Sequence, residues 1–268
     1  MRSIITTIFA FSFFLTSALA QDNSPYKTSL KIDGPIIAGS LGLGYLGLSM
    51  IKDKPDLTDA ELAAKSVNDV NSFDRFTAGN FSEHADKQSY IPFYASFAAP
   101  VLMLLNKNES KKAGQIMVLF TESMAITGAL FSISAGGVER SRPLVYSSDA
   151  PLEKRKDGDS QRSFYAGHTA ANATATFFLA KVYQDFNPDS KAKPYVWAAA
   201  AVVPAVVGYL RIKAGQHFLS DNLLGYAVGA GVGILVPELH KKSNTSNLSL
   251  SPAMIHGKQG ASLVYTLK

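Results

Sequence analysis

Stretches of helical length alternate with polar connections along most of this 268-residue chain. Six stretches that are apolar or rich in Ala and Thr are 15 to 24 residues long, and they occupy residues 35–51, 91–105, 114–137, 166–183, 195–210 and 223–237. Continuous runs of this length favour helices, because buried strands usually have only about four to eight residues. The pattern therefore predicts an all-α protein whose core is a bundle of about six helices.

The remaining segments divide the chain into regions. The chain begins with the short basic start Met1-Arg2. An apolar core follows and ends at the small-x-small site Ala18-Leu19-Ala20. This order is the pattern of a secretory signal peptide. We therefore expect four regions: a signal peptide over residues 1–20, an N-terminal helical and polar segment over 21–90, a helical domain over 91–237 and a tail over 238–268.

Local signals predict two smaller elements outside the helical domain. Thr58 and Glu61 fit a capping box that opens a surface helix towards Asn68. In the tail, two stretches of β-like pattern flank residues 256–260, which predicts a β-hairpin with His256 in its turn.

Composition narrows the classes of partner and of chemistry. The formal net charge is +5, and it becomes +4 if Arg2 leaves with the signal peptide, since 25 basic and 21 acidic residues remain. The basic residues form no clustered stripe, so we expect no nucleic acid partner. The chain has no cysteine, which excludes disulfides, thiolate metal sites and cysteine nucleophiles.

The hydrophobic runs leave the relation to a membrane open. Only residues 114–137 clearly reach the roughly 20 residues that a transmembrane helix needs. Lysine and arginine are spread over all the connections, so the positive-inside rule gives no orientation. A buried helical bundle and a partly membrane-embedded bundle both agree with the pattern, and we expect membrane association.

The densest group of reactive side chains lies between the last two apolar runs, at Arg211, His217 and Asp221. If the segment from His217 onward is helical, His217 and Asp221 lie on one face, four residues apart. A carboxylate in that place holds one imidazole nitrogen as N–H and leaves the other free as a base or nucleophile. Arg211 is a planar cation whose geometry suits phosphate.

Two further segments are expected at the same end of the bundle. Arg142-Pro143 follows the run 114–137, and Gly167-His168 begins the stretch 166–183. Because consecutive helices of a hairpin pair run in opposite directions, these loops converge with the Arg211–Asp221 segment. The topology therefore brings Arg142, His168, Arg211 and His217 into one site.

The order Arg-Pro, Gly-His and Arg-x5-His-x3-Asp resembles the type 2 phosphatidic acid phosphatase (PAP2) superfamily, which includes the vanadium haloperoxidases. The resemblance covers roughly residues 90–237, and the flanking segments resemble an exported branch from the Gram-negative envelope. It implies a helical PAP2 fold and a phosphohistidine mechanism. His217 would be the nucleophile, Asp221 its orienting group and His168 the acid. Arg142, Arg211 and the Gly167 N–H would bind phosphate.

The chain departs from the family pattern in its phosphate pocket. Ala135 stands where the family has a lysine, Ala166 where it has a serine of Pro-Ser-Gly-His, and Leu210 where a serine precedes the arginine. Losing one such donor typically lowers a rate by about 10²–10³-fold. We expect Arg140 or Lys213 to replace the missing lysine, and a lysine restored at Ala135 to raise turnover.

Three functions agree with these motifs. The first is hydrolysis of a phosphomonoester or diphosphate. The substrate would be a small phosphoester or a lipid such as phosphatidate, a polyprenyl diphosphate or a lipid A phosphate. The second is non-catalytic binding of anionic lipid, suggested by Ala135 and Ala166. The third is a vanadate-dependent peroxidase. For the phosphatase we expect no metal and no cofactor, and a location in the periplasm or cell envelope.

Overall fold

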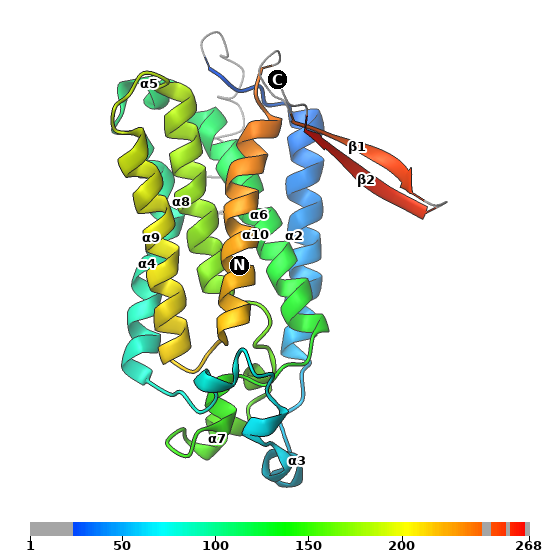
Figure 1. Ribbon diagram of the computed structural model, residues 1–268. Coiled ribbons are helices and arrows are strands. Elements are labelled where there is room, and N and C mark those ends of the chain that lie inside the picture. Colours follow the sequence, from blue (N-terminus) through cyan, green and yellow to red (C-terminus); the bar gives the residue numbers. More distant parts are fainter. Residues whose placement is uncertain (1–23, 243–247, 256–257, 266–268) are drawn as a thin grey trace, which may run out of the picture.

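The computed structural model describes residues 24–242, 248–255 and 258–265. The predicted signal peptide over 1–20 and the predicted turn residue His256 lie outside these described residues. Six long helices form an elongated bundle (Figure 1), which agrees with the predicted all-α class and core: α2 Leu30–Lys52, α4 Glu83–Met103, α6 Ala113–Gly137, α8 Gly167–Phe186, α9 Lys193–Lys213 and α10 Leu219–Leu239.

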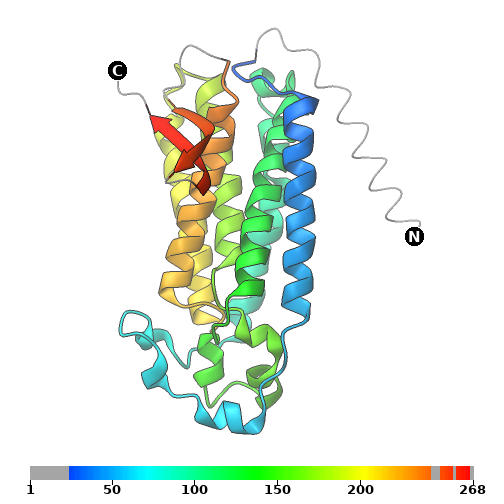
Figure 2. The same cartoon turned by 90° about the vertical axis from the view of Figure 1, so that its right-hand side faces the viewer.

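Short elements gather at both ends of the bundle. One end carries α3 Asp59–Ala64, α7 Leu152–Lys156 and 3₁₀ turns at Val67–Asp69, Arg75–Thr77, Pro143–Tyr146 and Gly158–Gln161. At the opposite end lie α5 Lys107–Ser110 and a hairpin of β1 Leu248–Ile255 and β2 Lys258–Tyr265 (Figure 2). We call these the loop end and the hairpin end.

Two of the predicted elements differ in extent from the observed ones. Thr58 and Glu61 do form the capping box, but α3 stops at Ala64 instead of reaching Asn68. The backbone turns extended at Lys65, and the Ser66 hydroxyl caps the next 3₁₀ turn instead. The tail forms the predicted antiparallel hairpin, but Lys258 already pairs with Ile255, so the connection is shorter than residues 256–260.

Helix α4 begins well before its apolar run. The Ser82 hydroxyl accepts a hydrogen bond from the Ala85 N–H at 3.2 Å, so the helix starts at Glu83. Serine is a favourable N-cap because it pairs a backbone donor that the first helical turn leaves unpaired. The polar residues between Glu83 and the apolar run at 91 therefore belong to the bundle, at its loop end.

The centre of the bundle is packed through small residues. Gly225, Gly229 and Gly233 of α10 follow one another at intervals of four. A Cβ at these positions would lie 2.2 to 2.5 Å from backbone oxygens of α8 or of Ala166, just before it. The two helices thus approach almost backbone to backbone, and any larger side chain would separate them. This close packing fixes the start of α10 against the start of α8.

The outer surface of the bundle is apolar. Tyr45 of α2 is 78% exposed, Leu105 after α4 81% and Tyr195 of α9 78%. Four of the described helices, α2, α6, α9 and α10, are long and apolar enough to cross a membrane. Exposed apolar side chains over several helices are stable in lipid and unfavourable in water. This surface supports membrane association.

Candidate functional site

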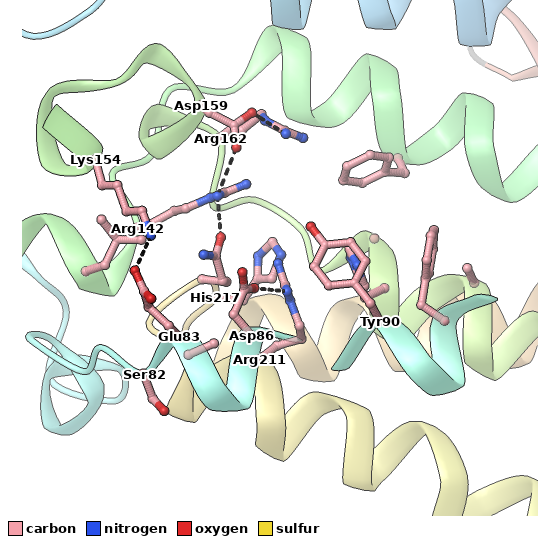
Figure 3. A pocket seen from close by; sticks show the side chains of 18 of the residues that line it. Ser82, Glu83, Asp86, Tyr90, Arg142, Lys154, Asp159, Arg162, Arg211 and His217 are labelled. Carbon is pink, nitrogen blue, oxygen red and sulfur yellow. Dashed lines mark hydrogen bonds and ion pairs between the residues drawn. The ribbon is translucent and has the colours of Figure 1, made fainter. Parts of the chain in front are cut away.

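A cavity of about 480 Å³ lies inside the loop end of the bundle. Its walls come from α4, α6, α8, the end of α9 and the loops around the 3₁₀ turns Pro143–Tyr146 (η4) and Gly158–Gln161 (η5). Figure 3 shows the charged side chains that converge on it. Five of the six predicted site residues line this cavity: Arg142, Gly167, His168, Arg211 and His217. Asp221 lies behind it.

His217 is held by the backbone of another segment. Its Nδ1 lies 2.6 Å from the carbonyl oxygen of Ser163. A carbonyl only accepts hydrogen bonds, so Nδ1 carries the proton and Nε2 keeps its lone pair. Burial lowers the pKa of the His217 imidazole well below 6.5, and the charges of Arg211 and Arg142 lower it further. The imidazole is therefore neutral at neutral pH.

The direct pairing of Asp221 with His217 was predicted from their spacing, and the structure corrects it. His217 precedes Leu219, the first residue of α10, so the two side chains do not share a helical face. One carboxylate oxygen of Asp221 instead accepts from the Phe218 N–H at 2.9 Å and from the Ser163 hydroxyl at 2.6 Å. Ser163 thus contacts both residues, Asp221 through its hydroxyl and His217 through its carbonyl, while Arg140 pairs with the other oxygen of Asp221.

A glycine turn places His217 at the cavity. Helix α9 ends at Lys213, and Gly215 then adopts φ +72°. A Cβ there would lie 1.9 Å from the backbone oxygen of Asn80. Only glycine satisfies both conditions without strain. The turn reverses the chain between the last turn of α9, which carries Arg211, and the start of α10.

Two buried arginines face the cavity, and carboxylates partly neutralise them. Arg142 pairs with Asp159 at 3.1 Å and donates to the side-chain oxygen of Gln216. Arg211 donates to Asp86 at 2.6 Å and to the Ser89 hydroxyl at 3.0 Å. Burial lowers the pKa of Arg142 to about 10, so it stays charged at neutral pH. These contacts leave the Nε atoms of both arginines buried with no hydrogen-bond partner.

His168 lies at the start of α8 between aromatic rings. Its ring centroid is 4.7 Å from that of Tyr90 and 4.1 Å from that of Phe93. Its Nε2 is buried without a hydrogen-bond partner. Burial lowers the pKa of His168, and Arg211 and Arg142 lower it further. A positive charge is thus unfavourable on His168 until an anion enters the cavity.

The glycine before His168 has a packing reason of its own. A Cβ on Gly167 would lie 2.7 Å from the Phe131 ring. Gly167 therefore lets the first turn of α8 pack against α6. Gly167 also lines the cavity. Binding of phosphate by the Gly167 N–H stays a prediction.

Comparison with known proteins gives the family. The sequence profile described as the PAP2 superfamily matches residues 116–245, which hold all five cavity residues named above and Asp221. This chain belongs to the PAP2 superfamily. A lipid A 1-phosphatase of Porphyromonas gingivalis is 27% identical, in an alignment that covers 88% of this chain and 48% of the relative. The chain therefore spans about half the length of that curated relative.

Two solved structures resemble the chain. A transmembrane PAP2-type phosphatidylglycerolphosphate phosphatase from Bacillus subtilis has a TM-score of 0.43 and 19% identity, covering 74% of this chain and 93% of that one. LpxE of Aquifex aeolicus has a TM-score of 0.41 and 21% identity, covering 60% and 90%.

The position of the missing PAP2 lysine does not face the cavity. Ala135 is fully buried in α6 and is absent from the cavity lining. A lysine at this position would bury an ammonium group, which is unfavourable unless an anion pairs with it. We therefore expect the change Ala135→Lys to lower stability, in place of the gain in turnover predicted from the motif.

The two cations expected to replace that lysine also lie elsewhere. Arg140 pairs with Asp74 at 2.6 Å and with Asp221, behind the cavity. The Lys213 amine lies 5.9 Å from the Tyr209 ring centroid. Instead Arg162, which pairs with Asp159, lines the cavity. Arg162, from the loop before α8, and Lys154 of α7 thus bring further cations to the cavity.

Sequence reasoning missed several residues around the site. They share a place in polar segments that the motifs skip: Asp86, Ser89, Asp159, Arg162, Ser163 and Gln216. The sequence did give a reason to consider Ser163, since this residue stands five residues before His168 in the segment that leads into α8. Asp86 could have been considered as well. Ser82 is the N-cap of α4, which places Asp86 near the start of that helix, in the polar region before the apolar run.

Proposed function

We propose that this PAP2 protein hydrolyses a phosphomonoester or diphosphate on a lipid, with a phosphorylated His217 as intermediate. One observation carries the proposal. Three buried nitrogens at the cavity lack hydrogen-bond partners: Nε of Arg142, Nε of Arg211 and Nε2 of His168. Beside them His217 is held neutral with Nε2 unprotonated.

The unpaired nitrogens define the ligand by its charge and shape. Leaving a buried polar group without a partner costs about 1–3 kcal/mol, and more for a charged group. A phosphoryl group carries three oxygens that accept such hydrogen bonds, and it is anionic. Its binding to Arg142 and Arg211 would displace the carboxylates that now pair with them. The cavity is therefore suited to a phosphate in place of a neutral ligand.

In the first step the lone pair of His217 Nε2 forms a bond to phosphorus. The bond between phosphorus and the leaving oxygen breaks, and His168 gives that oxygen a proton. The bound dianion makes the protonated form of His168 favourable, in contrast to the empty cavity. Arg142 and Arg211 stabilise the charge on the other oxygens, which is the main requirement of phosphoryl transfer.

In the second step a water molecule gives its proton to His168 and bonds to phosphorus. The bond from phosphorus to His217 Nε2 breaks, and its electron pair returns to the imidazole. The products are inorganic phosphate and the starting enzyme. Ser163 keeps the proton on Nδ1 in both steps, because its carbonyl oxygen only accepts.

The other wall of the cavity supports a lipid substrate. Tyr90, Phe93 and Phe97 of α4 line it together with Phe131 of α6. On the outer face of α4, Ile91 is 73% exposed. A helix that is apolar towards both cavity and surroundings suits a phosphate carried by an apolar chain. Lipid A 1-phosphate, the substrate in the name of the relative from Porphyromonas gingivalis, belongs in the test with phosphatidate and polyprenyl diphosphate.

We also propose that the chain acts after export, in the periplasm or cell envelope. The signal-like pattern of residues 1–20 supports this location. Cell fractionation with an antibody against the tail would test it, and recovery with the cytosolic fraction would contradict it.

The experiment is phosphate release by the detergent-solubilised protein from these lipids and from a soluble aryl phosphate. His217→Ala should lower kcat by at least about 10⁴-fold, as removal of a catalytic nucleophile does. The exposed His84 of α4 gives the matched control, and His84→Ala should keep full activity. Mass spectrometry of the acid-labile adduct should place the phosphate on His217. Equal activity of His217→Ala, or release from none of the esters, would refute the proposal.

A further inference from the structure

A second group of buried ionisable side chains lies at the hairpin end, away from the cavity. It consists of Asp33 in the first turn of α2, Glu122 of α6 and His240 at the C-cap of α10. Asp33 is 3% exposed, Glu122 2%, and the His240 side chain 12%. The phosphatase chemistry uses none of the three. We call them the Asp–Glu–His cluster.

The geometry of the cluster is that of a coordination shell. His240 Nε2 lies 3.2 Å from an oxygen of Asp33 and 3.6 Å from an oxygen of Glu122. The three atoms all lie within 4.8 Å of one another. Tetrahedral zinc with bonds of about 2.0–2.2 Å places neighbouring ligand atoms about 3.3–3.6 Å apart. The observed spacings therefore need little adjustment to hold an ion between the side chains.

Supporting contacts aim each ligand atom inwards. His240 Nδ1 lies 2.7 Å from the carbonyl oxygen of Val236, which keeps a proton on Nδ1. His240 Nε2 hydrogen-bonds to Asp33 Oδ1 at 3.2 Å, so a metal ion would take the place of the proton between these two atoms. The outer oxygen of Asp33 accepts the Ser29 N–H at 2.7 Å, which leaves the inner oxygen for the cluster. Such outer contacts accompany most metal-binding histidines and carboxylates, and they set the orientation of the ligand.

An independent observation is the unpaired oxygen of Glu122, which faces the cluster. Glu122 Oε2 is buried, faces His240 and makes no hydrogen bond. Within the described residues, the contacts of Asp33 and Glu122 offer one possible positive charge, the His240 imidazole. One imidazole balances one of the two buried carboxyl groups, so the second needs a proton or a metal ion, because buried charges are normally paired or bound to metal.

We propose that Asp33, Glu122 and His240 bind a divalent transition-metal ion such as Zn²⁺ at the hairpin end of the bundle. Two carboxylate oxygens and one neutral imidazole suit first-row ions, whereas Mg²⁺ and Ca²⁺ prefer oxygen ligands alone. The ion joins α2, α6 and α10, so its role is structural. The proposal does not depend on the proposed phosphatase activity.

The site would also anchor the segment that precedes α2. The Lys27 N–H donates to the His240 carbonyl at 2.7 Å, and the Lys242 N–H donates to the Pro25 carbonyl at 2.9 Å. These bonds pair the segment before α2 with the segment after α10. An ion on His240 and Asp33 fixes the same two helix ends from inside the bundle.

The experiment uses the full chain in detergent, treated with EDTA, desalted and titrated with ZnCl₂ at pH 7.5. The wild type should take up one zinc per chain and gain several degrees in Tm, because an ion that binds only the folded state stabilises it. Glu122→Gln should weaken zinc binding at least tenfold and lose the Tm gain. Glu109→Gln is the matched control and should keep both, since Glu109 is another buried glutamate of the hairpin end with an unpaired oxygen.

Equal zinc uptake by Glu122→Gln and wild type, or no uptake by wild type, would overturn the site. If Glu122→Gln does not fold, Asp33→Asn serves as the second variant, with the same loss expected. X-ray absorption of the zinc-loaded wild type decides independently of any variant. One imidazole with oxygen ligands supports the site, and two or more imidazoles overturn it.

Discussion

The two ends of this bundle bury unpaired polar atoms of opposite kinds. At the loop end, among the described residues, these atoms are nitrogens and one hydroxyl: Arg142 Nε, Gln161 Nε2, Tyr165 Oη, His168 Nε2 and Arg211 Nε. At the hairpin end, within the part of the chain that the structure describes, they are all oxygens: Glu109 Oε2, Gln115 Oε1 and Glu122 Oε2. The arginine and amide nitrogens are donors without acceptors, which call for an anion. The oxygens of the hairpin end are acceptors without donors, which call for a cation or a proton.

Both ends also contain side chains of the opposite charge, and these are already paired. The loop end has carboxylates as well, but Asp86 and Asp159 each pair with arginine and leave the Nε atoms unpaired. The hairpin end has lysines as well, and Lys181 pairs with Asp185 and Glu238 at 2.5 and 2.6 Å, away from Glu122. Whether the unpaired atoms are donors or acceptors therefore indicates the charge of a ligand better than the net charge of the surrounding side chains does.

The largest effect tests the donors of the loop end. Arg142→Gln should lower kcat/KM for the best lipid phosphate by about 10²–10³-fold, because it removes a charged donor to the transferring phosphoryl group. Arg155, which donates to the Val145 carbonyl at 2.9 Å outside the cavity, provides the matched control. Steady-state kinetics on both variants measure the difference. A comparable loss in Arg155→Gln would show that the effect is structural.

The next effect tests how Asp221 reaches His217. Ser163→Ala removes the hydroxyl bonded to Asp221 and keeps the carbonyl bonded to His217. We expect kcat to fall about 10–100-fold with KM nearly unchanged, which is typical of an outer contact that orients a reactive ligand. Ser163→Thr keeps the hydroxyl and should recover most of the rate. A rise in KM alone would instead place Ser163 in substrate binding.

A smaller effect distinguishes Arg162, which lines the cavity, from Arg140, one of the two cations expected to replace the family lysine. Arg162→Gln should raise KM for phosphate esters by about tenfold, the effect of roughly 1.4 kcal/mol of lost binding, because Arg162 lines the cavity. Arg140→Gln should mainly lower Tm, since Arg140 pairs with the fully buried Asp74 and Asp221. Kinetics and thermal denaturation of both variants test this division. The reverse assignment, with KM raised only in Arg140→Gln, would restore the original expectation.

The sequence predicted the helices and the convergence of the cavity residues because both follow from long-range pattern. Apolar runs separated by short connections give alternating helices, so Arg142, His168 and His217 must meet at one end. The local geometry of the site was less accessible. The spacing of His217 and Asp221 implies contact only inside a helix, and the turn at Gly215 delays the start of α10 by two residues.

Contacts between segments that lie far apart in the sequence could not be predicted at all. Ser163 meets His217 through a backbone carbonyl, an atom that every residue carries. Asp33, Glu122 and His240 stand far apart in the sequence, at spacings that match no metal motif. Their contact depends on how three helices are aligned along the bundle axis. This alignment cannot be derived from the hydrophobic pattern of any short stretch of the sequence.

The smallest effect concerns the response of the loop end to acid. Burial holds the pKa of His168 below its ordinary value of 6.5, so the unfolded chain binds more protons than the folded chain below that pH. Stability should therefore fall as pH falls from 7 to 5. His168→Gln removes this loss, and its stability should decrease by about 1–2 kcal/mol less over that range. Thermal denaturation at both pH values measures it.

The exposed His84 again provides the control, and His84→Gln should show the acid sensitivity of the wild type. Inorganic phosphate sharpens the test. An anion bound beside His168 favours its protonated form, so phosphate should reduce the acid sensitivity of the wild type and leave that of His168→Gln unchanged. Zinc, which binds the opposite end, should raise Tm equally in both. An acid response that is the same in wild type and His168→Gln would mean that His168 is not the buried neutral group.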